Sequence, residues 1–200
     1  MDATGGEQAS FDRVMQAFHW LTLVLIAAIY SAAWVAHSGL AGEWYQPVMQ
    51  LHRSLGLTVA ALTIFRLVWR RRARIPELPA DLLFLQKFAA RGTEALLYLL
   101  LLMQPFLGLL QTGARGQAVD FYFLFRLPAV IGLDRPLARQ LHDFHALTAN
   151  VLLILIALHS AAALFHHFIR RDGVLDAMLP ARLRGIGRSA FALRPSRRQT

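Results

Sequence analysis

Four long apolar stretches limit what this chain can fold into. They cover roughly residues 14–36, 51–69, 93–112 and 145–169 of the 200-residue sequence. About twenty apolar residues suffice to cross a bilayer as an α-helix. The composition agrees, because only 16% of the residues are charged, against about 25% in a typical soluble domain. The pattern predicts an all-α membrane protein built as a bundle of four transmembrane helices.

The length and the spacing of these stretches predict one membrane domain, residues 13–180, between a polar segment 1–12 and a basic tail 181–200. The N-terminus lacks the basic region of a cleavable signal peptide, so the first apolar stretch is expected to remain as a span. Residues 113–141 are expected to form a long loop. Its aromatic part, "DFYFLFRLPAVIG", is too short to span and is expected at the membrane interface.

The basic residues indicate orientation. The net charge is +9, but the arginines cluster between apolar stretches and at the C-terminus, which favours membrane topology and predicts no nucleic-acid partner. They concentrate after the second and fourth stretches, whereas the first connector has none before Arg53. Positively charged loops stay on the cytoplasmic side, so both termini are expected there. The absence of cysteine excludes disulfides, iron–sulfur clusters and thiolate zinc sites.

Histidines lie within these spans, where an ionisable side chain is costly and often functional. His145 and His159 are fourteen residues apart, about 21 Å along a helix, and about 40° apart around its axis, so they share a face. Because successive spans run in opposite directions, His19 is level with His159, and His52 is level with His145.

Two histidines from different helices at the same depth suit the two axial positions of a haem iron. A zinc site would bring its ligands to one point, and a proton relay would not need matched pairs. A single intramembrane histidine could equally bond a neighbouring carbonyl, but the matched depths favour ligation. The sequence therefore predicts two haems b. The inner iron is assigned to His19 and His159, and the outer iron to His52 and His145.

Other residues near these histidines are candidates for cofactor contact. Arg53 and Arg66 are candidates for pairing with haem propionates, because a guanidinium at membrane depth needs an anion. Small residues, among them Gly56, Ala146 and Ala149, flank the histidines and leave room for a flat porphyrin. They would serve ordinary helix packing equally well.

The remaining histidines are weaker candidates for iron ligation. His37 is expected in solvent, and His142 at the outer rim of the fourth span. His166 and His167 are at the inner edge, where an interfacial or propionate-bonding role is expected.

The chain resembles the prokaryotic cytochrome b561 family over about residues 11–180. The similarity rests on "FHW" with His19, "LHRSLGLTVAALTIFRLVWR" with His52, "RIPELP" and "YLLLLMQPFLGLL". It rests above all on "FHALTANVLLILIALHSAAALFHHFIRRDGVLDAMLP". By resemblance, the family's four axial ligands fall on the same four histidines. The sequence departs from the family pattern at Glu94, where relatives often carry a histidine, and Glu94 is a candidate proton carrier.

The resemblance implies a multi-pass protein of the bacterial cytoplasmic (inner) membrane that carries single electrons. It implies an oxidoreductase that oxidises superoxide at the outer side and reduces ubiquinone. His142, Arg53 and Arg139 would then attract the anionic substrate. The aromatic residues 121–125, or Trp44 with Tyr45, would line a quinone groove or anchor the protein at the interface.

Two other functions remain open from the sequence. The first is a haem-bearing membrane anchor that only passes electrons for a partner protein, such as a dehydrogenase or hydrogenase. The second is a non-redox transporter with histidines in a proton path, which the paired depths disfavour.

Overall fold

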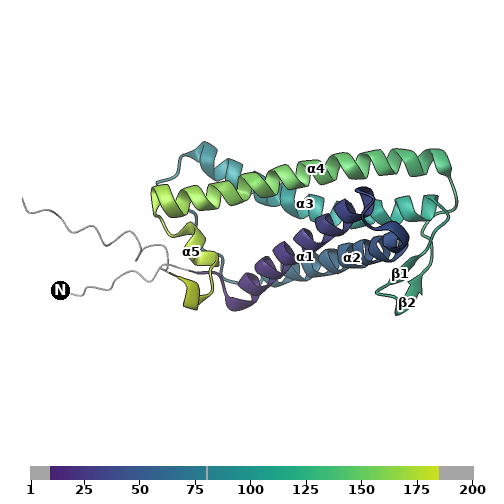
Figure 1. Cartoon of the computed structure of the whole chain (residues 1–200). Helices are drawn as coiled ribbons and strands as arrows, with labels where there is room; N and C mark the ends of the chain where they lie inside the picture. The colour runs from purple at the N-terminus through teal and green to yellow at the C-terminus, as the bar shows by residue number, and fades with distance from the viewer. Residues whose placement is uncertain (1–9, 80, 185–200) are drawn as a thin grey trace, which may run out of the picture.

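Four antiparallel helices form the body of the protein (Figure 1). The computed structural model describes residues 10–79 and 81–184. The four helices are α1 (Arg13–His37), α2 (Tyr45–Arg70), α3 (Phe84–Ala114) and α4 (Arg135–Phe165). Each is long and apolar enough to cross a membrane. The predicted all-α architecture with four spans is confirmed.

Shorter elements connect and close the bundle. They are η1 (Gly42–Trp44), the strands β1 (Val119–Phe121) and β2 (Phe125–Leu127), the π-helical turn η2 (His166–Arg170), α5 (Val174–Met178) and η3 (Ala181–Leu183). The two strands pair antiparallel, with Val119 opposite Leu127. The hairpin and the starts of α2 and α4 lie together at one end of the bundle, which is called the outer end below (Figure 1). α5 lies at the other end, which is called the inner end.

The expected loop over residues 113–141 is too long, because α4 begins at Arg135. Asp134 caps the helix by accepting a hydrogen bond from the Leu137 amide at 3.0 Å, and Pro136 lies in the first turn, where proline fits a helix. Part of the aromatic segment forms the hairpin. The first turns of α4 are polar and charged, so an apolar stretch does not reveal them.

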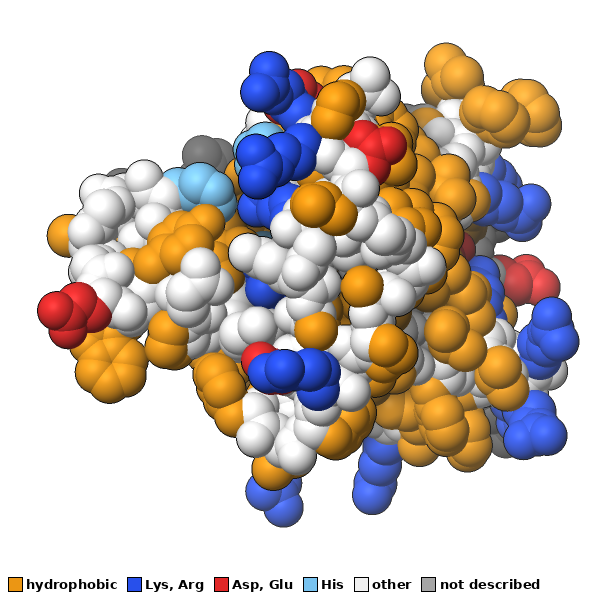
Figure 2. Space-filling view, turned by 90° about the vertical axis from the view of Figure 1, so that its right-hand side faces the viewer, with side chains coloured by type: hydrophobic (Ala, Val, Ile, Leu, Met, Phe, Trp, Pro, Cys, Tyr) orange, Lys and Arg blue, Asp and Glu red, His pale blue; other side chains and the backbone are white. Residues whose placement is uncertain are grey.

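Neighbouring helices pack in chain order, α1 on α2, α2 on α3 and α3 on α4, whereas α1 and α4 make much less backbone contact. The Tyr30 hydroxyl of α1 reaches across to donate a hydrogen bond to the Ala149 carbonyl of α4 at 2.5 Å. A buried cluster of Val59, Leu100 and Leu152 fills the middle of the bundle. Hydrophobic side chains cover much of the outside (Figure 2), as expected where helices face lipid.

The inner end is closed by α5, which docks on the start of α1. The Phe11 amide donates to the Ala177 carbonyl at 3.1 Å, and the Trp20 indole to the Met178 carbonyl at 3.1 Å. Residues 1–9 and 185–200, which make up most of the predicted polar segment and basic tail, lie outside the described residues. The division at residues 12 and 180 stays a prediction.

Candidate functional site

Two pairs of histidine rings face each other across the bundle, one toward each end. At the inner end His19 of α1 and His159 of α4 have ring centroids 6.3 Å apart. At the outer end His52 of α2 and His145 of α4 have ring centroids 6.4 Å apart. Among the described residues, no hydrogen bond joins the two rings of either pair. The structure thus brings together the residues that matched depth paired.

These separations fit metal ligation. An imidazole nitrogen binds a metal at about 2.0 Å and is about 1.1 Å from its ring centroid, so two imidazoles on opposite sides of one metal have centroids about 6.2 Å apart. The separations of 6.3 and 6.4 Å are within about 0.2 Å of this value. Among the described residues, no group of three or more His, Cys, Asp or Glu side chains could hold a metal ion. Two imidazoles on opposite sides of one iron, with a porphyrin lying between them, are a ligand arrangement that suits haem b.

The backbone orients His52. Its Nδ1 lies 3.0 Å from the carbonyl oxygen of Ile29 in α1. A carbonyl oxygen only accepts hydrogen bonds, so Nδ1 carries the proton and Nε2 keeps its lone pair for a metal. The orientation of His52 thus depends on a contact from the neighbouring helix.

Helix α3 supports His145 closely. The Gln104 amide nitrogen donates to the His145 carbonyl at 3.3 Å and to the Thr148 hydroxyl at 2.7 Å. A side chain at Gly108 would start 3.7 Å from His145 Cε1. The Nδ1 of His145 is buried and has no partner among the described residues. Gln104 and Gly108 were missed from the sequence, where "MQPFLG" gave only a helix and a family motif.

Open space adjoins the histidines. A Cβ at Gly56, one turn after His52, would have no atom within 4 Å. On α4, Ala146, Ser160 and the His159 ligand candidate itself are exposed. Small side chains and the wide separation of α1 from α4 therefore leave room for a flat group, and the residues fit a porphyrin.

A half-buried cation lies near the inner end. The Arg66 Nε is buried without a hydrogen-bond partner among the described residues, and the buried Tyr98 hydroxyl lies near Arg70. The Arg66 guanidinium is 5.4 Å from the centroid of the Tyr98 ring, a cation–π distance. A buried donor without an acceptor costs about 1–3 kcal/mol, and an anionic group such as a propionate would remove that cost. Tyr98 was not predicted, although it is the one polar side chain in an aliphatic run.

At the outer end, basic side chains and histidine gather on one face (Figure 2). Arg53 donates a hydrogen bond to the Gln117 side chain at 2.9 Å and is near enough to Arg115 for mutual repulsion. His142 Nδ1 is 3.1 Å from the Gln111 amide nitrogen. Arg139 is exposed on α4. Arg53 and His142 thus contact neutral amide side chains, and these contacts leave the charge of Arg53 available to an anion.

The other histidines have partners within the chain. His37 Nδ1 is 2.7 Å from the Ala33 carbonyl of its own helix and is exposed. His166 Nδ1 is 2.5 Å from Asp172 Oδ2, and His167 Nδ1 is 3.8 Å from Asp176 Oδ1. Burial opposes ionisation of Asp172, but hydrogen bonds led by that from His166 outweigh it and lower the pKa of Asp172.

Glu94 has a structural partner. Its carboxylate forms an ion pair through both oxygens with Arg70 at the end of α2. This pair joins α2 to α3 at the inner end.

Comparison with known proteins gives consistent matches over most of the chain. The family model described as prokaryotic cytochrome b561 matches residues 10–181. "Cytochrome b561 homolog 2" of Escherichia coli (strain K12) is 29% identical over 170 residues, covering 83% of this chain and 89% of the relative. "Probable superoxide oxidase CybB" of Yersinia pestis is 30% identical over 164 residues, covering 81% and 91%. "Cytochrome b562" of Cereibacter sphaeroides is 28% identical over 184 residues, covering 88% and 99%.

Proposed function

Because the chain belongs to the prokaryotic cytochrome b561 family, we propose that it holds two haems b and carries single electrons across the bacterial inner membrane. Membership makes it a multi-pass bacterial membrane protein and a b-type cytochrome of electron transfer. What we propose beyond family membership is the number of haems, the electron donor at the outer side and the quinone acceptor.

The observation that carries the proposal is the pair of matched ring separations, 6.3 and 6.4 Å, at opposite ends of one bundle. His19 with His159 would hold the inner haem, and His52 with His145 the outer haem. Bound haem supplies an iron that alternates between ferric and ferrous states. Arg66 with Tyr98 would bind propionate at the inner end, and Arg53 at the outer end.

Between the two pairs, the chain provides an apolar layer. Val59, Leu100 and Leu152 pack there, with Leu25 and Ile29 of α1 against them. A low dielectric between the sites strengthens the electrostatic effect of nearby charges on each site. The bundle therefore suits transfer between fixed sites.

The outer reactant is proposed to be superoxide, which one relative's name suggests. Arg53, His142 and Arg139, with Arg115 close by, would raise the local concentration of this anion by electrostatic steering. Two superoxide ions each lose one electron to become dioxygen, and ubiquinone takes up the two electrons with two protons. The protein would thus act as a superoxide:quinone oxidoreductase.

Two aromatic residues from the candidate quinone-groove segments are exposed. Trp44 is 71% exposed and Phe123 is 62% exposed, which suits anchoring at the lipid interface.

Glu94 is proposed as a proton carrier at the inner end. The Glu94 carboxylate is paired with Arg70, so this ion pair must open when Glu94 takes up a proton. If Glu94 carries protons to the quinone, a Glu94→Ala variant should slow quinone reduction and change its pH dependence.

Rapid mixing of the purified, haem-loaded protein with superoxide tests the function. We expect the haem absorbance to show reduction within the mixing experiment and reoxidation on addition of a soluble ubiquinone. Neutralising Arg139 and Arg115, both exposed, together should slow reduction at low ionic strength and leave haem content unchanged. No reduction by superoxide, with a stoichiometric dehydrogenase or hydrogenase copurifying, would instead support the anchor function.

A further inference from the structure

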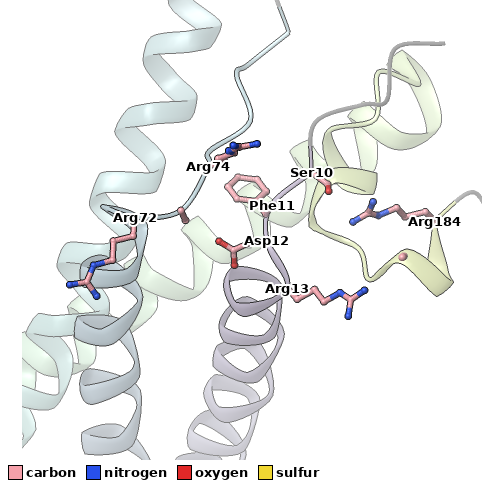
Figure 3. Close-up of a pocket in the computed structure, with 9 residues that line it drawn as sticks. Ser10, Phe11, Asp12, Arg13, Arg72, Arg74 and Arg184 are labelled. Atoms are coloured by element: carbon pink, nitrogen blue, oxygen red, sulfur yellow. The ribbon is translucent and has the colours of Figure 1, made fainter. Parts of the chain in front are cut away.

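A pocket lined by arginines lies at the inner end of the bundle, where the spans α1 and α2 meet the C-terminal segment (Figure 3). Its volume is about 570 Å³. Its lining consists of Ser10, Phe11, Asp12, Arg13, Arg72, Ala73, Arg74, Ala181 and Arg184. Three separate parts of the chain thus contribute to one pocket, and four of its nine described lining residues are arginine.

The positive charge of this pocket is not neutralised within the described residues. None of its four arginines forms an ion pair there. Among the described lining residues only Asp12 is acidic, and it is already engaged. It caps α1 by accepting a hydrogen bond from the Met15 amide at 2.8 Å, and it accepts another from the Trp69 indole at 3.3 Å.

Arginine and apolar side chains line the pocket together. Arg184 points toward Ser10 and Arg74 lies beside Phe11, whereas Arg13 and Arg72 extend outward on either side of the start of α1 (Figure 3). Phe11, Ala73 and Ala181 supply the apolar lining. A cationic pocket with apolar side chains in its lining suits an amphiphile whose head is anionic and whose stem is hydrocarbon.

The position of the pocket identifies the source of such an amphiphile. It lies where the apolar spans end, since Arg13 begins α1 and Arg72 follows α2. Phosphate groups of membrane lipids lie at this depth, and basic pockets between transmembrane helices bind them. We propose that this arginine pocket binds the phosphate headgroup of an anionic phospholipid. The site is separate from both histidine pairs and does not depend on the proposed electron route.

Native mass spectrometry of the haem-loaded full chain in detergent tests this proposal, with phosphatidylglycerol and phosphatidylcholine titrated separately. The pocket variant is Arg74→Gln/Arg184→Gln. The control variant, Arg71→Gln/Arg91→Gln, removes the same charge from the same end outside the pocket. Haem content and far-UV circular dichroism verify that each variant folds, and the single variant Arg184→Gln serves if the double variant does not.

Phosphatidylglycerol should bind the parent chain tightly and phosphatidylcholine weakly. The pocket variant should lose about thirty-fold in phosphatidylglycerol affinity, since each guanidinium near an anionic lipid contributes a factor of about five, and the single variant about five-fold. The control should change by less than about three-fold. Equal losses of phosphatidylglycerol affinity in both double variants would overturn the proposal that the lipid headgroup binds in this pocket. Displacement of the lipid by millimolar inorganic phosphate would overturn the lipid assignment in favour of a soluble phosphate ligand.

Discussion

Single side chains decide whether the proposed ligands can meet a cofactor. His52 is oriented by the Ile29 carbonyl at 3.0 Å, and Gly56, one turn later, adjoins open space. A larger side chain at Gly56 would not disturb the chain itself but would occupy the space required by a porphyrin. Gly56→Leu should therefore lose most of the outer haem, as measured by haem absorbance per chain, while keeping its helical circular dichroism.

The matched control for that variant is Gly92→Leu. Gly92 also has no atom within 4 Å of a built Cβ, but it is exposed and far along the chain from the histidines. Its haem content should equal that of the parent. Equal haem loss in both variants, or none in Gly56→Leu, would contradict the assignment of the space beside Gly56.

Arg66 is a second residue with a measurable electrostatic role. Its Nε is buried without a partner among the described residues, so it is placed to interact with a propionate. Arg66→Gln removes one positive charge and should lower the midpoint potential of one haem by about 50 mV, which corresponds to about 1 kcal/mol of Coulomb energy. Potentiometric titration measures this, and Arg66→Lys, which keeps the charge, should retain most of the parent potential.

At the scale of elements, the hairpin β1–β2 depends on α2. Ser54 is fully buried, and its hydroxyl accepts a hydrogen bond from the Tyr122 amide at 2.9 Å. Ser54→Ala leaves that amide without its partner, at a cost of about 1–3 kcal/mol. Hydrogen exchange of the Tyr122 amide should accelerate. Ser38→Ala, which changes an exposed serine, should leave it unchanged.

The π-helical turn after α4 gives a pH-dependent prediction. Asp172 bonds His166 and Arg170, and its pKa is lowered although burial opposes this. A lowered pKa means that Asp172 stabilises the fold fully above its unfolded pKa, about 3.9, and loses this effect as the pH falls through the lower folded value.

Asp172→Asn should therefore reduce stability by about 1–2 kcal/mol at pH 7, with the difference beginning to shrink below about pH 4 and disappearing only below the lowered pKa of folded Asp172. Thermal unfolding at several pH values measures it, and the exposed Asp143→Asn is the control. A difference that grows as the pH falls would contradict the role given to Asp172.

Helices were predictable and their ends were not. Apolar runs locate the spans because lipid-facing side chains need no special partners. The starts of α3 at Phe84 and α4 at Arg135 were missed because those turns are polar or interrupted. The three-residue strands were missed because they depend on Ser54, a residue 65 or more positions earlier in the chain. At the site, helical phase was enough to pair the histidines, but the support from Ile29, Gln104 and Tyr98 arises only in three dimensions.

At the scale of the whole molecule, the inner end, which carries the arginines after α2 and α4, should face the cytoplasm. The chain has no cysteine, so single-cysteine variants report topology without background. Ser38→Cys, between α1 and α2, should react with an impermeant maleimide added outside intact spheroplasts. Ala73→Cys, between α2 and α3, should react only after lysis. The reverse pattern would show that the termini face outward.

The central claim is that two pairs of imidazoles each hold one haem in one four-helix bundle. Haem quantified per chain in purified protein tests it most directly, with histidine variants as internal standards. We expect two haems in the parent, one in His52→Ala, still one in His52→Ala/His145→Ala, and none in His52→Ala/His159→Ala. A parent chain that holds a single haem when saturated, or a His52→Ala/His145→Ala variant that holds none, would contradict the account.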